Sequence, residues 1–126
     1  MRLKLATRYV DYDTKGHVNN AVFLTYFEMA REAAWVDAMG MNADFPFILA
    51  EASVKYVSEA MIGQPLEVTM TTPEIRTKAW VWQYVISDAS DGRVVAEGRT
   101  VQVMYDYDAR ATVPIPEAVR AKLAAL

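Results

Sequence analysis

The chain has 126 residues, a length that fits one domain and leaves no room for a second core beside the first. Apolar residues make up 53% of it, which excludes a disordered chain, and the net charge of −3 argues against a general nucleic-acid binder. There are no cysteines, so disulfides, thiolate metal sites and a cysteine nucleophile are excluded. We find no signal peptide and no apolar run near the ~20 residues of a membrane span, and therefore expect a cytoplasmic protein without a membrane segment.

The first predicted elements are a strand and a loop. Side chains alternate along residues 3–10, which predicts a strand. Residues 11–19 are mostly polar and contain Gly16, so they predict a loop with its flexible point at the glycine. Asn20 is a favourable residue for the N-cap of a helix, so we expect the next element to begin there.

A helix is expected over residues 21–39, and Gly40 is expected to end it. Apolar residues cover most of its circumference, and its polar residues form one narrow stripe: Thr25, Glu28, Arg31 and Glu32. A helix that is apolar nearly all round is a buried helix, wrapped by other elements. Glu28 and Arg31 lie three residues apart and are expected to form an ion pair.

The remainder of the chain reads mainly as strands. Alternation and apolar runs predict four of them, at residues 47–57, 66–72, 79–87 and 93–105. Pro116 fits the first turn of a short C-terminal helix over residues 117–124. One strand, one helix and then four strands indicate an α+β fold with an antiparallel sheet, and at this point several folds of that class remain open.

The predicted strand at residues 79–87 is apolar on both faces. Its tryptophans and tyrosine point to one side, and Val81 and Val85 point to the other. One face can cover the helix, but the chain has too few helices to cover the second face. We therefore expect a partner subunit to do so.

The segment from Asp13 to His17 is the main candidate for chemistry. Asp13 precedes a glycine turn and a helix N-terminus, so its carboxylate can face a substrate held there and act as a general base on water or as a nucleophile. Backbone N–H groups around Gly16 to Asn19 can stabilise an oxyanion. The simpler interpretation, which the spacing alone favours, is that Asp13 only caps the loop.

His17 is the only histidine of the chain. Histidine titrates near pH ~6.5 when unperturbed, and His17 can orient Asp13, polarise a carbonyl or protonate a leaving group, although a lone histidine is more often an ordinary hydrogen-bonded residue. Asp11 would share a strand face with Asp13, so it could assist Asp13 or raise its pKa, but we expect Asp11 to be structural. Two carboxylates and one histidine without a defined spacing are weak evidence for a metal, and we predict no metal site.

One motif in this region resembles a known family. Its residues are Asp13, Gly16, His17, Val18, Asn19 and Asn20, followed by Tyr26, Phe27, Glu28, Ala30 and Arg31. They resemble the hotdog-fold acyl-CoA thioesterases of the 4-hydroxybenzoyl-CoA thioesterase type, and the similarity runs over nearly the full chain. The resemblance implies a single α+β hotdog domain over residues 1–126, with a long buried central helix wrapped by an antiparallel sheet and a short C-terminal helix. It also implies hydrolysis of acyl-CoA to a free acid and coenzyme A without a cofactor.

The same resemblance implies catalytic roles. Asp13 would be the general base or nucleophile, with His17 beside it. Backbone N–H groups at the start of the helix would polarise the thioester carbonyl, from a loop made of Gly16, Val18, Asn19 and Asn20. Related acyl-carrier-protein thioesterases of plants share His-Val-Asn-Asn and the earlier Asp, but they place an Asn where this chain has Lys15, which favours Asp13 as the central residue.

The resemblance also implies how substrate and partner bind. The acyl group would lie along the central helix, near Phe23, Tyr26 and Phe27. Arg76 and Lys78, at a turn between two strands, would contact the phosphates of coenzyme A, and a solvated turn is the plain alternative. The protein would be a homodimer or a homotetramer built as a dimer of dimers, with each site completed by two chains.

Two other functions remain open from the sequence. A hotdog hydratase or dehydratase would use His17 with Glu28, although no proline follows the histidine as it usually does in those enzymes. A non-catalytic module that binds acyl-CoA is the third possibility, against which the retained Asp13 counts. Acyl chain length and the choice between coenzyme A and acyl carrier protein stay undetermined.

Overall fold

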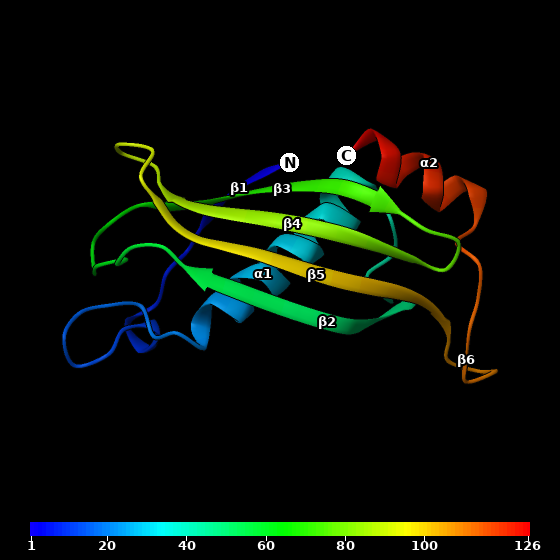
Figure 1. Cartoon of the computed structure of the whole chain (residues 1–126), viewed down its shortest axis with the longest axis horizontal. Helices are drawn as coiled ribbons and strands as arrows, with labels where there is room; N and C mark the ends of the chain where they lie inside the picture. Colours follow the sequence, from blue (N-terminus) through cyan, green and yellow to red (C-terminus); the bar gives the residue numbers. More distant parts are fainter.

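The structure, a computed structural model, describes all 126 residues. One sheet has the strand order β1-β3-β4-β5-β2, with every neighbouring pair antiparallel. Its strands are β1 (Arg2–Leu5), β2 (Phe47–Tyr56), β3 (Leu66–Ile75), β4 (Ala79–Asp88) and β5 (Val94–Asp106), and the short β6 (Ala111–Thr112) pairs with the end of β5. In Figure 1, α1 (Val22–Glu32) crosses one face of the curved sheet, and α2 (Glu117–Ala125) lies beside one end of it. The predicted architecture of one long helix against one antiparallel sheet is confirmed.

The four strands predicted after the helix are all present. Three of them match the prediction to within one residue at each end. β3 is the exception, because it continues to Ile75 where the sequence ended it at residue 72. A shift in register between Thr71 and Glu74 accommodates Pro73, which has no N–H to donate to a sheet, and pairing with β4 resumes beyond it.

The prediction of a strand over residues 3–10 is wrong beyond Leu5. Residues Tyr9–Asp11 form a short 3₁₀ turn instead. The turn is held by the side chain of Asp11, which accepts hydrogen bonds from the Arg8 N–H at 2.8 Å and from the Arg8 guanidinium at 2.9 Å. A side chain that bonds backward to a residue three positions earlier competes with extended backbone, and here it prevails.

The start of the helix also differs from the prediction. The helix begins at Val22, and Asn20 makes no capping bond. The N-cap is Ala21, and Asn19 lies before it: its Oδ1 accepts the Ala21 N–H at 3.0 Å, and its carbonyl accepts the Val22 N–H at 3.0 Å. The far end is as predicted: α1 runs on through a π-helical segment, η2 (Ala33–Ala38), and the chain then turns at Gly40, whose φ is +66°.

Only one face of α1 is buried in the protomer. The face on the sheet carries fully buried side chains, namely Phe23, Tyr26, Phe27 and Ala30. The opposite face is exposed and includes Leu24, Thr25 and Glu28. The expectation of a helix buried all round is therefore not met within one chain.

Close approach of helix and sheet depends on Gly98 in β5. The ring of Phe27 stacks on the ring of Tyr84, with centroids 4.4 Å apart, and lies directly over Gly98. A Cβ atom at position 98 would come within 2.2 Å of the Phe27 ring. Glycine is therefore required there for packing, and not for an unusual backbone angle.

The outer face of the sheet is mixed in character. Val81 is buried and pairs with Val101, whereas Val85 is 36% exposed and Gln83 between them is exposed. β2 lies at an edge of the sheet and pairs only with β5, so one side of its backbone has no strand beside it. No helix in the structure combines the length and the hydropathy needed to cross a membrane.

Candidate active site

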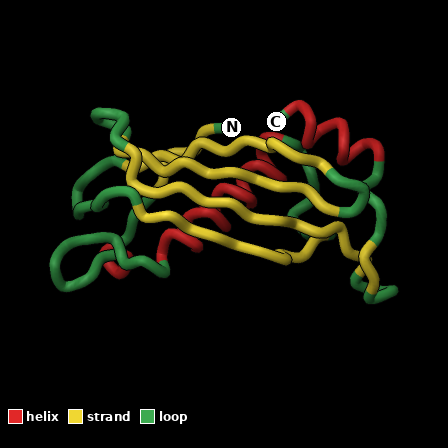
Figure 2. The backbone as a smooth tube through the Cα atoms, in the orientation of Figure 1, coloured by secondary structure: helices red, strands yellow, loops and turns green.

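The loop that carries Asp13 lies at the end of the sheet where α1 begins (Figure 2). It is a tight hairpin, closed by a bridge between Tyr12 and Val18 and by a hydrogen bond of 2.8 Å from the Asp13 N–H to the His17 carbonyl. Gly16 forms its turn with a φ of +76°, in the left-handed region that favours glycine. The predicted flexible point is therefore the residue that lets Asp13 and His17 come together.

The carboxylate of Asp13 is held by the backbone of its own loop. Its Oδ1 accepts hydrogen bonds from the Lys15 N–H at 2.8 Å and from the His17 N–H at 3.1 Å. These two bonds, followed by the nearby His17 and Lys15 charges, hold the pKa of Asp13 below its ordinary value. Asp13 is consequently an ionised, oriented carboxylate at neutral pH.

Most backbone N–H groups of the predicted oxyanion loop already donate hydrogen bonds to backbone carbonyls of the protein. The N–H of Gly16 donates to the Asp13 carbonyl, that of Val18 to the Ala60 carbonyl, and that of Asn19 to the Asp11 carbonyl. The N–H of Asn20 donates to no protein acceptor and lies at the exposed start of α1. Among the four loop residues named from the sequence, Asn20 alone offers a backbone donor to a ligand.

A cavity of about 260 Å³ opens beside this loop. Asp13, His17, Asn20 and Phe23 line it from the N-terminal side. The opposite wall comes from the end of β2 and the segment after it: Tyr56, Val57, Ser58, Glu59 and Ala60. Sequence reasoning did not find this wall, because no local signal ties a segment so far along the chain to the Asp13 loop.

Asp11 has the structural role expected of it. Its buried carboxylate is ion-paired with Arg8 and also accepts the Tyr26 hydroxyl at 3.0 Å. Burial alone would raise the pKa of Asp11, but the hydrogen bonds from Arg8 and Tyr26 together outweigh it and lower that pKa. Burial and the adjacent Asp11 charge in turn raise the pKa of Tyr26, so its phenol stays a hydrogen-bond donor.

The three residues predicted to line the acyl site lie in different surroundings. Phe23 borders the cavity beside Asp13, and its ring packs edge-on against Tyr56 with centroids 5.6 Å apart. Tyr26 and Phe27 are fully buried in the protomer, the first bonded to Asp11 and the second stacked on the sheet. Within one chain, Phe23 is therefore the one of these three residues that a ligand at Asp13 can reach.

The two predicted CoA-binding residues lie at the other end of the sheet. The turn between β3 and β4 carries Arg76 and Lys78, and Figure 1 shows it opposite the loop that precedes α1. Arg76 is ion-paired with Glu74 at 2.7 Å, and Lys78 approaches the hydroxyl of Thr112 at 3.4 Å. One protomer does not bring this turn to its own Asp13.

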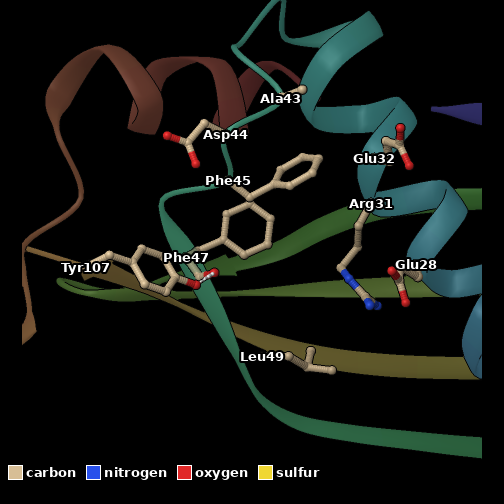
Figure 3. A pocket seen from close by; sticks show the side chains of 9 residues that line it. All are labelled: Glu28, Arg31, Glu32, Ala43, Asp44, Phe45, Phe47, Leu49 and Tyr107. Atoms are coloured by element: carbon tan, nitrogen blue, oxygen red, sulfur yellow. Dashed lines mark hydrogen bonds between the residues drawn. The ribbon is translucent and has the colours of Figure 1, made fainter. Parts of the chain in front are cut away.

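A larger cavity, of about 490 Å³, lies farther along the exposed side of α1 (Figure 3). Its polar lining includes Glu28 and Arg31, which do not form the ion pair expected from the sequence, since Arg31 is ion-paired with no carboxylate. Its apolar wall comes from Phe45, Phe47, Leu49 and Tyr107. His17 and Glu28, the pair that a hydratase would use, line different cavities of the protomer.

Residues 7–123 match the model of the thioesterase-like superfamily. Among curated proteins, the chain is 24% identical over 131 residues to the long-chain acyl-CoA thioesterase FadM of Escherichia coli, covering 98% of this chain and 96% of that protein. It is 28% identical over 124 residues to the L-carnitine dehydrogenase/betainyl-CoA thioesterase of Rhizobium meliloti. That match covers 95% of this chain but only 25% of the relative, so the chain spans about a quarter of that protein's length.

Solved structures agree with the sequence matches. A thioesterase from Thermus thermophilus, complexed with coenzyme A and Zn, has a TM-score of 0.86 at 28% identity, covering 98% of this chain and 91% of that one. A 1,4-dihydroxy-2-naphthoyl-CoA thioesterase from Synechocystis has a TM-score of 0.88 at 23% identity, covering 99% and 96% of the two chains. The fold and the family model together confirm what the motif from Asp13 to Arg31 predicted: the chain belongs to the thioesterase-like superfamily and is a hotdog-fold thioesterase.

Proposed function

We propose that this protein hydrolyses acyl-CoA thioesters to a free acid and coenzyme A, with Asp13 as the catalytic carboxylate. The observation that carries the proposal is the ionised Asp13, fixed by two backbone N–H groups, in a cavity at the N-terminus of α1. This carboxylate is already deprotonated and oriented, so no other base is needed before it accepts a proton or attacks a carbonyl carbon. Relatives that act on long-chain and betainyl thioesters of coenzyme A support the substrate class.

The proposed reaction uses few groups. Asp13 either removes a proton from water as the water attacks the thioester carbonyl, or attacks that carbonyl itself to form an anhydride that water then hydrolyses. The carbonyl oxygen gains negative charge and would accept the free N–H of Asn20, at the positive end of α1. The carbon–sulfur bond breaks, and the departing thiolate of coenzyme A takes a proton, for which His17 is the nearby donor.

We further propose that each site is completed by two chains of a homodimer. β2 has a free edge, and two copies that pair antiparallel along it would be related by a twofold axis. Such a pair would bring the large cavity and the basic turn of one chain towards the Asp13 loop of the other, because both lie toward the opposite end of β2 from that loop. Phe23 would then begin an acyl site that the partner's cavity continues. Pairing of two such dimers would give the tetramer.

The decisive experiment replaces Asp13 with asparagine. Asn keeps the shape of the side chain but removes the base and the nucleophile, so kcat/KM should fall by at least ~10²-fold. The release of free thiol is measured with long-chain, betainyl and 1,4-dihydroxy-2-naphthoyl thioesters of coenzyme A. Asp37→Asn, an exposed carboxylate on η2, is the matched control and should retain full activity.

Turnover of Asp13→Asn at the wild-type rate would reject the proposed mechanism. An assay of an enoyl-CoA for hydration, run beside the hydrolysis assays, separates a hydratase from a thioesterase. Tight binding of acyl-CoA without turnover by the wild-type protein would instead indicate the non-catalytic module.

A further inference from the structure

His17 has a carboxylate neighbour outside its own loop. The Nε2 atom of His17 lies 3.5 Å from Oε2 of Glu59, and both side chains line the cavity that contains Asp13. This separation is slightly long for a direct hydrogen bond, but contacts in catalytic sites commonly shorten when substrate binds. A carboxylate only accepts hydrogen bonds, so the contact requires the proton of a neutral imidazole to sit on Nε2.

The segment that carries Glu59 is fixed to the Asp13 loop by its backbone. The Val18 N–H donates to the Ala60 carbonyl at 2.8 Å, and the Ile62 N–H donates to the Gly16 carbonyl at 2.8 Å. A bridge between His17 and Met61 lies between these two bonds. The backbone of Glu59 is therefore held beside that of His17 by a short two-stranded ladder.

Arg93, at the start of β5, anchors the same segment from behind. Its Nη1 donates to the Glu59 carbonyl at 2.8 Å and to the Ser58 hydroxyl, and its Nη2 lies 3.8 Å from Asp88. Arg93 thus ties the backbone of Glu59 to the ends of β4 and β5. The side chain of Glu59 is left free to face the cavity.

The charges around His17 give Glu59 a distinct position. The charged neighbours of His17 on its own loop are Asp13 and Lys15. The Asp13 carboxylate accepts the backbone N–H groups of Lys15 and His17. From the segment packed against the loop, Glu59 is the only charged side chain that lines the cavity. Asp13 bonds to the backbone of His17, whereas Glu59 approaches its ring, so the two carboxylates act on different parts of the residue.

We infer that Glu59 is a positioning residue for His17, holding its imidazole with Nε2 protonated and oriented beside Asp13. The inference rests on the proposed function, in which His17 supplies the proton to the departing thiolate. A carboxylate beside an imidazole stabilises the protonated ring from which a proton is donated at Nδ1, and it holds the remaining proton on Nε2 after that donation. Because the Glu59 side chain is 68% exposed, the contact contributes little to folding stability, and its effect falls on the orientation of His17.

The first test is spectroscopic and uses the fact that His17 is the only histidine. Ring ¹⁵N chemical shifts of the neutral imidazole report which nitrogen carries the proton. We expect one dominant Nε2–H tautomer in the wild type and a mixture in Glu59→Gln, with Glu59→Asp between the two. Glu97→Gln, which removes an exposed carboxylate on β5, is the matched control and should leave the spectrum unchanged. Identical ring shifts in the wild type and Glu59→Gln would overturn the inference.

The second test is kinetic. Glu59→Gln should lower kcat for acyl-CoA hydrolysis by about 2- to 5-fold, the range expected of an exposed ion pair, and should change KM by less than about 2-fold. Glu59→Asp should recover part of kcat, and Glu97→Gln should behave as the wild type. A tautomer change without any change in kcat would overturn the positioning role. Inactivity of the wild type on every thioester would count against the proposed function instead, while the ring shifts would still decide the contact between Glu59 and His17.

Discussion

The two ends of the central helix differ in what holds them. At the N-terminal end, the Asp13 loop is exposed and is ordered by backbone hydrogen bonds, such as the one from Val18 to Ala60. At the C-terminal end, Trp35 is fully buried, with its ring 5.1 Å from that of Phe47 and 6.2 Å from that of Trp80. Apolar burial dominates folding free energy, so this end is held mainly by its buried aromatic side chains. The polar end is free to carry a charged carboxylate and an unpaired N–H.

The middle of the helix connects these two ends. Phe27 locks the helix to the sheet over Gly98, and Tyr26 bonds to Asp11 in the turn just before the Asp13 loop. Changes at Phe27 or Gly98 should therefore affect stability alone, whereas changes at Tyr26 should affect both stability and the site. Substitutions at these positions and at the turn carrying Arg76 and Lys78 test this separation of stability from site geometry.

The largest stability effect is expected from Gly98→Ala. The added Cβ would meet the Phe27 ring at 2.2 Å, and the ring is also stacked on that of Tyr84, which limits its movement. Overpacking of this kind costs about 1–3 kcal/mol or more, so thermal unfolding followed by circular dichroism should shift down by several degrees. The double variant Gly98→Ala with Phe27→Leu should be less destabilised than the sum of the single changes. Additive effects would show that the clash is absorbed elsewhere.

The sequence predicts features that depend on neighbouring residues, and it does not predict those that depend on contacts between distant segments. The residues of the Asp13 motif are close together in the chain, so its carboxylate, its glycine turn and its histidine can be recognised from the sequence. Tyr56 reaches the site through the pairing of β2 with β5, and Glu59 through backbone bonds between its segment and the Asp13 loop, neither of which a local pattern specifies. The start of α1 shows the limit for single residues, because Asn19 and Asn20 have the same side chain, and the loop geometry lets only Asn19 bond to Ala21, the residue before the helix.

The engagement of Gly16, Val18 and Asn19 was equally hidden from the sequence. Each of their N–H groups finds its acceptor in a backbone carbonyl, and only the folded loop reveals which donor remains. The 3₁₀ turn before the loop arises in the same way, from the Asp11 carboxylate bonding back to Arg8. Backbone hydrogen bonds depend little on residue type. The motif therefore predicts which residues form the Asp13 loop, but it does not predict which of their N–H groups are free.

A smaller stability effect is expected from Tyr26→Phe. Removing the hydroxyl takes one donor from the buried Asp11 carboxylate, which keeps its bonds to Arg8, so we expect a loss of about 1 kcal/mol of unfolding free energy at neutral pH. Tyr12→Phe is the matched control, because the Tyr12 hydroxyl bonds only to the neutral hydroxyl of Thr7 and is partly exposed. Urea unfolding measures both, and equal losses in the two variants would argue against a special role for the Asp11 contact.

The pH dependence of that variant follows from the lowered pKa of Asp11. A carboxyl group whose pKa is lower in the folded than in the unfolded state contributes stability above its unfolded pKa of about 3.9, and loses it as the pH falls through the folded value. Without the Tyr26 hydroxyl the folded pKa rises towards the unfolded one. The loss of stability on acidification below about pH 4 should therefore be smaller in Tyr26→Phe than in the wild type, and unfolding curves at pH 7 and pH 3 measure the difference.

The smallest effect is expected at the basic turn, where replacing Arg76 and Lys78 with alanine tests whether the site extends to a partner chain. Arg76 is already ion-paired with Glu74, which partly neutralises its charge. Lys78, whose ammonium group approaches only the neutral hydroxyl of Thr112, should therefore contribute more to phosphate binding. If the two side chains bind phosphates of coenzyme A, KM for acyl-CoA should rise by a few-fold and lose part of its salt dependence, because exposed charges act weakly and are screened. Hydrolysis of a short thioester without the nucleotide should not change, and Lys4→Ala on β1 should leave both substrates unaffected. Within one chain, the turn and the Asp13 loop lie at opposite ends of the sheet. A rise in KM confined to acyl-CoA would therefore mean that one chain binds the phosphates and its partner cleaves the thioester.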